Sequence, residues 1–128
     1  DHRDLHSFPT RRSSDLQSTW ERFLDPAEPT HLALAWKDDE AVGMVQFIYH
    51  RSNWSIGNSC YLQDLFVSPQ VRGTGAGRRL IEHVYAAAKD NQCAKVYWLT
   101  QETNATAIQL YERMAERPGF ILFRKALS

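Results

Sequence analysis

The chain has 128 residues, of which 43% are hydrophobic, and its 15 Lys and Arg balance its 15 Asp and Glu. This length and apolar content suit one domain with a buried core, while zero net charge argues against a nucleic-acid-binding protein, which needs a basic surplus. No apolar run approaches the roughly 18–20 residues that span a bilayer, so we expect a cytoplasmic protein without membrane or nucleic-acid partners.

The first 16 residues, DHRDLHSFPTRRSSDL, differ in composition from the rest of the chain. They are polar and show neither helical nor strand periodicity. Three interpretations are open: a basic arm with a phosphorylation site at 11–14, a metal-binding arm with His2 and His6, or a translated sequencing-adaptor sequence, which the string resembles. Two His without a third ligand make a poor metal site, and we favour the third interpretation. Residues 1–16 are then a non-native, disordered segment, and residues 17–128 form the domain.

The first regular element that the pattern predicts is a short amphipathic helix between Asp15 and Asp25, which ends before Pro26. Its apolar residues recur at spacings of three to four, so we expect them to dock as one stripe against the rest of the fold. These residues are Leu16, Trp20, Phe23 and Leu24.

An antiparallel hairpin is predicted next. Two apolar runs, His31–Lys37 and Glu40–His50, flank the turn pair Asp38-Asp39. A polar loop over Arg51–Ser59 leads to a third predicted strand, Tyr61–Val67. The near-continuous hydrophobicity of the hairpin indicates a sheet that is covered on both faces.

The second half of the chain alternates helices and strands. The best amphipathic pattern predicts a helix over Gly75–Asp90, and a second helix is predicted over Thr103–Glu116. Strands are predicted at Lys95–Thr100 and at Phe120–Ala126. This order indicates a mixed α/β layer in which Lys95–Thr100 is a parallel neighbour of Tyr61–Val67.

A glycine-rich turn, VSPQVRGTGAGR over residues 67–78, joins the third strand to the long helix. Glycines let backbone amides approach a ligand, and a helix start offers N–H groups and partial positive charge, so the turn can hold a phosphate or pyrophosphate. A Walker A loop, GxxxxGKS/T, is absent. Gly73, Gly75 and Gly77 are spaced GxGxG, unlike the GxGxxG of a dinucleotide fold. A bare helix start with glycines for close packing stays open as the alternative.

Two motifs in this half of the chain resemble the GNAT superfamily of N-acetyltransferases. Residues 72–77, RGTGAG, fit its Gln/Arg-x-x-Gly-x-Gly/Ala signature between a strand and a helix. Its Asn-x-x-Ala-x-x-Leu-Tyr pattern follows the next strand at Asn104, Ala107, Leu110 and Tyr111. The resemblance covers the chain from Thr30 to Ser128.

The resemblance implies an α/β GNAT fold, with a mixed, mostly antiparallel central sheet, helices on both faces and a V-shaped splay between two parallel strands. Such domains begin with a further strand and helix, which residues 1–16 replace, so we expect an N-terminally truncated domain. The strand at His31–Lys37 then becomes an uncovered edge that lowers stability and favours self-association. The stretch between Tyr111 and Gly119-Phe120 is longer than the common pattern, which suggests a closing strand exchanged or paired in a homodimer.

The resemblance also implies acetyl-CoA as the co-substrate, and no metal. The pyrophosphate is expected on the backbone amides of the turn and helix start, with two arginines as candidates for the ribose phosphate. The pantetheine arm is expected along the end of the third strand and near the Asn-x-x-Ala motif. The residues assigned in this way are Arg72, Gly73, Thr74, Gly75, Ala76 and Gly77 for the pyrophosphate, Arg78 and Arg113 for the ribose phosphate, and Phe66, Val67, Asn104, Ala107 and Tyr111 for the pantetheine arm.

Acetyl transfer to an amine needs a neutral amine, stabilisation of the oxyanion and a proton for the departing thiolate. By resemblance Tyr111 supplies that proton; the alternative is a core aromatic. Candidate bases are Asp64 and Glu102, near the ends of neighbouring strands, while Gln63 stands where diamine acetyltransferases carry an acid. Either carboxylate can equally be solvated or ion-paired, and a water chain can replace it.

The sequence therefore predicts an acetyl-CoA-dependent N-acetyltransferase in which a primary amine attacks directly in a ternary complex. The acceptor is a small amine, favoured to be cationic by the nearby acids, or a peptide amine. Cys60 and Cys93 lie away from the motifs and are expected to be ordinary core thiols, which argues against a covalent acetyl-cysteine. A CoA-binding regulatory module without turnover and an interaction fold without CoA are the competing interpretations.

Overall fold

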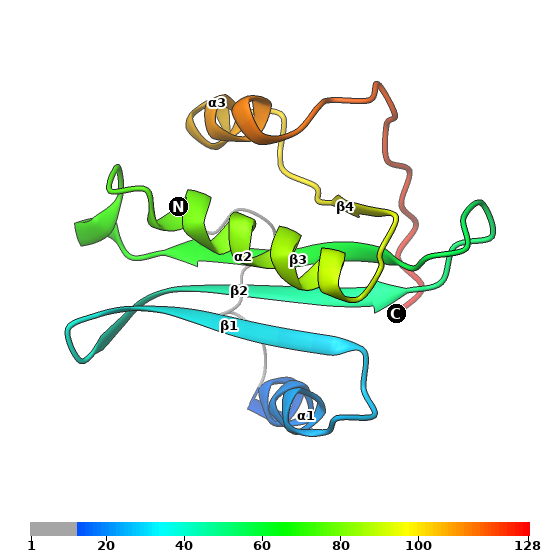
Figure 1. Ribbon diagram of the computed structural model, residues 1–128, viewed down its shortest axis with the longest axis horizontal. Coiled ribbons are helices and arrows are strands. Elements are labelled where there is room, and N and C mark those ends of the chain that lie inside the picture. Colours follow the sequence, from blue (N-terminus) through cyan, green and yellow to red (C-terminus); the bar gives the residue numbers. More distant parts are fainter. Residues whose placement is uncertain (1–12) are drawn as a thin grey trace.

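The computed structural model describes residues 13–128, so most of the segment 1–16 lies outside the described part. Its last four residues, 13–16, form the start of the first helix, so the prediction of a disordered segment is wrong for them. Figure 1 shows a sheet with one helix across it and further helices near its two edges. In chain order the elements are α1 (Ser13–Leu24), β1 (Thr30–Lys37), β2 (Glu40–His50), β3 (Ser59–Val67), the 3-10 turn η2 (Pro69–Val71), α2 (Ala76–Asp90), β4 (Lys95–Tyr97) and α3 (Ala105–Met114). No helix among them is long and apolar enough to cross a membrane.

The strands form one mixed sheet in the order β1-β2-β3-β4. The hairpin is confirmed, because β1 pairs antiparallel with β2 and closes at Lys37 and Glu40 around a turn in which Asp38 has a φ of 55°. β2 pairs antiparallel with β3, and β3 pairs parallel with β4, as predicted. β1 and β4 are therefore the two edges of the described sheet.

One hydrophobic core fills the space between α2 and the middle of the sheet. The predicted apolar stripe of α2 is confirmed, since its inward positions are almost completely buried against side chains of β2 and β3. The α2 positions are Leu80, Ile81, Val84 and Ala88, and the sheet positions are Val45, Phe47, Cys60, Leu62 and Leu65. The core joins β2, β3 and the helix α2, and so it fixes the end of β3 relative to the start of α2.

The prediction that the apolar stripe of the first helix docks against the rest of the fold is wrong in part. Trp20 is 52% exposed and Leu24 is 65% exposed, while Phe23 is half-buried. The helix packs near β1, at the edge of the sheet, instead of across a sheet face (Figure 1). An edge position offers too little apolar surface to cover a whole helical stripe.

Two strand predictions near the C-terminus also need correction. β4 ends at Tyr97, so Trp98–Thr100 is not part of the strand. Phe120–Ala126 forms no strand, and every residue from 115 to 128 is exposed. A strand exists only where a neighbouring strand supplies its hydrogen bonds, and neither segment is paired with a strand of the described part of the chain.

The core of α2 sets the stability of the fold. Ile81→Ala should lower the free energy of unfolding by about 2–4 kcal/mol, because Ile81 is completely buried and the change leaves a cavity in a close-packed layer. Urea denaturation followed by circular dichroism measures this. Glu82→Ala, at the next position but on the exposed face, serves as the control and should change stability by less than about 1 kcal/mol. Equal losses in the two variants would contradict the packing described above.

Candidate active site

The glycine turn between β3 and α2 has a backbone that only glycine adopts readily. Gly73 has a φ of 78° and Gly75 a φ of 90°, both in the left-handed region. A Cβ added at either position would meet no atom within 4 Å. Glycine is therefore needed at these two positions because of the backbone conformation and not because a side chain would clash. The surface above them is open to a ligand.

The start of α2 has no side-chain cap. Gly75 occupies the N-cap position and has no side chain to accept hydrogen bonds from the first helical amides. Ser, Thr, Asp or Asn at this position would normally satisfy one of those N–H groups. The first turn, Ala76–Arg78, thus presents backbone donors and the positive end of the helix dipole to the same open surface. The arrangement suits an anion with several acceptor oxygens.

Gly77 has a different role from the two other glycines of the turn. It lies inside α2, and a Cβ on it would come 3.7 Å from both Leu110 Cδ2 of α3 and Val67 Cγ2 of β3. The beginning of α2, the end of β3 and the helix that carries Tyr111 therefore meet at this residue. The close-packing alternative for the glycines fits Gly77, whereas the anion-binding interpretation fits Gly73 and Gly75.

β3 and β4 separate beside this turn. They are paired only at Ser59–Lys95, Cys60–Val96 and Tyr61–Tyr97, after which β3 continues to Val67 without β4 alongside. The register with β2 shifts between Gln46, which pairs with Asp64, and Phe47, which pairs with Leu62, so Gln63 is an extra residue on β3. This β-bulge lies two residues after the last pair with β4, and a bulge bends the strand that contains it. The predicted V-shaped splay is present, with Phe66 and Val67 on the diverging part of β3.

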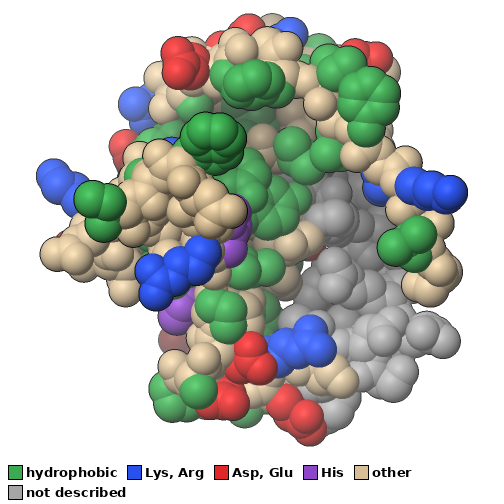
Figure 2. All heavy atoms as spheres, turned by 90° about the vertical axis from the view of Figure 1, so that its right-hand side faces the viewer, with side chains coloured by type: hydrophobic (Ala, Val, Ile, Leu, Met, Phe, Trp, Pro, Cys, Tyr) green, Lys and Arg blue, Asp and Glu red, His purple; other side chains and the backbone are tan. Residues whose placement is uncertain are grey.

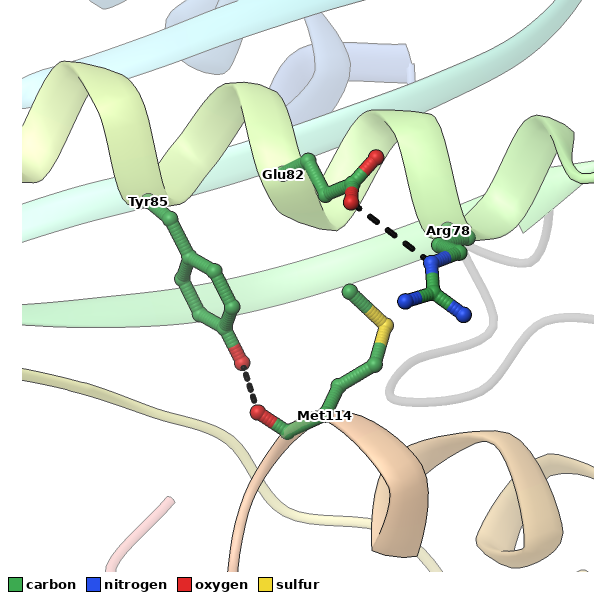
Figure 3. A network of polar contacts seen from close by, with 4 residues as sticks. All are labelled: Arg78, Glu82, Tyr85 and Met114. Carbon is green, nitrogen blue, oxygen red and sulfur yellow. Dashed lines mark hydrogen bonds and ion pairs between the residues drawn. The ribbon is translucent and has the colours of Figure 1, made fainter.

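Tyr111 lies at the inner side of α3 and is only 8% exposed. Its ring makes an edge-to-face contact with Trp98, the residue after β4, with centroids 5.3 Å apart. Trp98 also packs against Tyr85 of α2, whose hydroxyl donates a hydrogen bond to the backbone oxygen of Met114 at the end of α3 (Figure 3). Tyr111 is thus held by an aromatic cluster between α2 and α3. Trp98 was not singled out in the sequence, because nothing local tells what it packs against.

Asn104 and Ala107, the other residues of the second motif, lie at the start of α3. Asn104 stands at the N-cap position of α3 and makes no side-chain cap hydrogen bond there. Its Nδ2 lies 3.3 Å from Thr100 Oγ1, to which it donates a hydrogen bond. Ala107 packs against the main core. The contact between Asn104 and Thr100 ties the helix start to the segment that leaves β4.

The two candidate bases differ in accessibility. Asp64 is completely buried on β3, opposite the buried Gln46, whereas Glu102 is exposed in the turn before α3. A dissolved amine reaches Glu102 directly and reaches Asp64 only through an intermediary. Gln63 is half-buried at the bulge between Asp64 and the last pair with β4.

Two of the arginines proposed for a phosphate lie on helix surfaces. Arg78 Nε is 3.5 Å from Glu82 Oε2, in an ion pair on the side of α2 that faces α3 (Figure 3). Arg113 donates a hydrogen bond from Nε to the backbone oxygen of Gln109. Arg72, in the turn itself, is exposed. All three side chains are exposed.

The cysteines are unsuited to carry an acetyl group. Cys60 is completely buried in the core, and burial raises its pKa to about 12. Burial also raises the pKa of Cys93, at the end of the α2–β4 connection. With raised pKa values, both thiols stay protonated near neutral pH. The thiolate is the reactive form, so neither cysteine is suited to attack a thioester. This supports the expectation that they are structural thiols.

The geometry agrees with what known proteins show. A sequence model described as the acetyltransferase (GNAT) family matches residues 2–115. The chain belongs to this family. GNAT proteins are acyltransferases that use acetyl-CoA.

Among curated relatives, the D-amino-acid N-acetyltransferase HPA3 of Saccharomyces cerevisiae is 33% identical over 110 residues, which is 84% of this chain and 68% of the yeast protein. A thialysine N-epsilon-acetyltransferase of Caenorhabditis elegans is 29% identical over 128 residues, covering 94% of this chain and 79% of its own. The solved structure of AAC(6')-Iy with a bisubstrate analogue superposes with a TM-score of 0.82 at 18% identity, covering 94% of this chain and 84% of that one. That likeness shows the shared fold.

Gly75 and Gly77 should respond oppositely to alanine. Gly75→Ala places a side chain on a left-handed backbone and should cost about 1–2 kcal/mol of stability. Gly77→Ala lies in a regular helix, where the new Cβ meets only ordinary contacts, and should be neutral or stabilising by up to about 1 kcal/mol. Thermal and urea unfolding of the pair measures the difference. Destabilisation by Gly77→Ala alone would mean that the turn is shaped by crowding instead of conformation.

Proposed function

We propose that this chain transfers the acetyl group of acetyl-CoA to the primary amine of a small molecule, by direct attack in a ternary complex. The proposal rests on one observation: the anion-binding turn, the diverging end of β3 and the helix of Tyr111 meet at Gly77. The reaction requires that the pyrophosphate and the pantetheine arm of acetyl-CoA are bound next to a catalytic acid of the protein.

The backbone of the turn binds the pyrophosphate in this proposal. Amides from Arg72 to Gly77 surround the open surface, and the dipole of α2 adds positive potential. Arg78 and Arg113 serve the ribose phosphate, and Arg78 must then exchange its ion pair with Glu82 for the phosphate. That exchange costs little, because both side chains of the pair are 54% exposed and a solvated pair is weak.

The extended arm lies along β3 where β4 has turned away. Backbone groups of Phe66 and Val67 are the proposed partners, and Asn104 and Ala107 line the opposite side at the start of α3. Acetyl-CoA supplies a thioester, whose acetyl carbon is open to attack by a neutral amine. The bulge at Gln63 reorients the backbone amides there and can direct one of them at the thioester oxygen, where it stabilises negative charge.

We assign the two proton transfers to Tyr111, which donates a proton, and to an accessible carboxylate, which accepts one. The Tyr111 hydroxyl donates its proton to the departing sulfur, and the contact with Trp98 fixes the direction of the ring. Glu102 is exposed and can take the proton of the incoming ammonium directly. Asp64 is completely buried, so we assign it a share only through a water or a neighbouring side chain.

The acceptor is proposed to be the amine of a free amino acid or a similar small, cationic molecule. The names of the yeast and nematode relatives specify D-amino acids and thialysine, both of which are small primary amines. A peptide amine is the second candidate acceptor, and a CoA-binding module without turnover is the alternative function.

An amine panel tests the proposal. With acetyl-CoA held constant, release of free thiol should rise at least about tenfold over background with one or more of D-amino acids, thialysine, lysine or a diamine, and less with a peptide. Titration calorimetry of acetyl-CoA runs in parallel. Binding without turnover on any amine would support the regulatory module, and no binding at all would overturn the assignment of the turn.

Tyr111→Phe separates chemistry from binding. It should lower kcat about a hundredfold or more, because the reaction loses its positioned acid, while the Kd for acetyl-CoA stays within about twofold. Tyr85→Phe is the matched control: it removes a hydroxyl that touches the same Trp98 cluster but bonds to Met114. Unchanged turnover in Tyr111→Phe, or an equal loss in both variants, would reduce Tyr111 to a core aromatic.

A further inference from the structure

A cluster of polar aromatic residues lies on the face of the sheet opposite α2. Its members are His50 of β2, Tyr61 of β3 and Tyr97 of β4. Each of them is next to a residue that packs into the core with α2, so these three side chains point to the other face. Figure 2 views the molecule from the end where β2 finishes and β3 and β4 begin, and His side chains are among those that reach its surface. No step of the proposed reaction uses this cluster.

The central contact of the cluster is a hydrogen bond from Tyr97 to His50. The Tyr97 hydroxyl lies 2.6 Å from His50 Nε2, and His50 Nδ1 lies 2.8 Å from the backbone oxygen of Arg51. A carbonyl oxygen only accepts hydrogen bonds, so Nδ1 carries a proton, and in the neutral imidazole Nε2 is left as an acceptor. Burial raises the pKa of the Tyr97 hydroxyl, which is therefore protonated near neutral pH and donates to Nε2.

This hydrogen bond connects two strands that are not neighbours in the sheet. β3 lies between β2 and β4, so the backbones of these two strands are two inter-strand spacings apart, about 10 Å. The Tyr97 ring also packs on Tyr61 of β3, with centroids 5.0 Å apart, and Lys95 Nζ lies 5.6 Å from the centre of the Tyr97 ring. Side chains from three strands therefore hold Tyr97 in place.

Tyr97 stands at the point where the two parallel strands separate. It is the last residue of β4, and Tyr61–Tyr97 is the last pair of β3 with β4. The next residue, Trp98, packs on the core side, where its ring contacts Tyr85 and Tyr111. Two consecutive aromatic residues are thus anchored on opposite faces of the sheet. The chain is fixed from both sides at the position where the splay begins.

We propose that the hydrogen bond between His50 and Tyr97 holds the end of β4 beside β3 and so sets the width of the splay that receives the pantetheine arm of acetyl-CoA. This role rests on the proposed function, in which the arm lies along the diverging part of β3. His50 and Tyr97 are positioning residues, because they act on the arm through the two strands. Without the bond, Tyr97 keeps only its ring contacts, and the end of β4 is held less firmly. An arm that has to order a loosely held strand binds less tightly, since the ordering opposes binding.

The affinities for two ligands test this role. Acetyl-CoA contains the pantetheine arm, whereas adenosine 3′,5′-bisphosphate has the nucleotide and its phosphates without the arm. In titration calorimetry, Tyr97→Phe should raise the Kd for acetyl-CoA about fivefold, because one hydrogen bond is lost, and should leave the Kd for the bisphosphate within about twofold. His50→Ala should have the same effect, and the double variant should lose no more affinity than either single variant, because both remove the same interaction.

Two further variants are controls. His50→Gln offers an amide oxygen as the acceptor for Tyr97 and should keep the acetyl-CoA Kd within about twofold of the wild type. Tyr49→Phe removes another hydroxyl from the same end of β2, one that accepts a hydrogen bond from Asn91, and should also leave this Kd within about twofold. Hydrogen exchange at the amides of Lys95–Tyr97 should become faster in Tyr97→Phe and stay unchanged in Tyr49→Phe.

Three outcomes would overturn the proposal. If the wild type binds acetyl-CoA more tightly than the bisphosphate and Tyr97→Phe changes neither Kd, the bond does not set the splay, and the proposed function stands. Equal losses for both ligands would indicate a general loss of structure. Equal affinity of the wild type for both ligands would mean that the splay does not bind the arm, which would also remove that part of the proposed function. Turnover is measured separately by thiol release, so an arm-dependent loss in a chain without turnover would still support the positioning role.

Discussion

The separation of β3 from β4 after three residue pairs is the feature on which the rest of the site depends. A parallel pair that continued to Val67 would close the sheet and leave no room for an extended ligand. The bulge at Gln63 bends β3 at this point, and the segment after Tyr97 turns away to reach α3. Backbone groups in a fold need hydrogen-bond partners, so a splay of this kind is a natural place for an extended, amide-containing arm.

Packing around Gly77 fixes the two other parts of the site to that splay. The start of α2 lies close to the end of β3 and to α3 at this position, so the glycine turn lies near the helix that carries Tyr111. The large aromatic cluster of Tyr85, Trp98 and Tyr111 adds stiffness on the other side of α3. Packed elements thus hold the ring of Tyr111, while the turn presents backbone donors that need no side-chain ordering.

The N-terminal and C-terminal parts of the domain are less well covered than its centre. Trp20, Leu24 and the apolar residues of Phe120–Leu127 are exposed, and β1 and β4 are the edge strands of the described sheet. Exposed strand edges and apolar strand-like segments attract one another.

Most of the architecture follows from local pattern. The apolar periodicity of Leu80, Ile81 and Val84, the turn at Asp38-Asp39 and the glycine signature each specify an element, because side-chain spacing and backbone preference act over a few residues. The family motifs likewise located Tyr111 and the turn. Only the tertiary structure decided where β4 ends, that Gln63 is a bulge, that Asp64 is buried and that Trp98 supports Tyr111. It also showed that Phe120–Ala126, a strand by composition, pairs with none of the described strands. Pairing and burial are set by segments distant in the chain, which no local window contains.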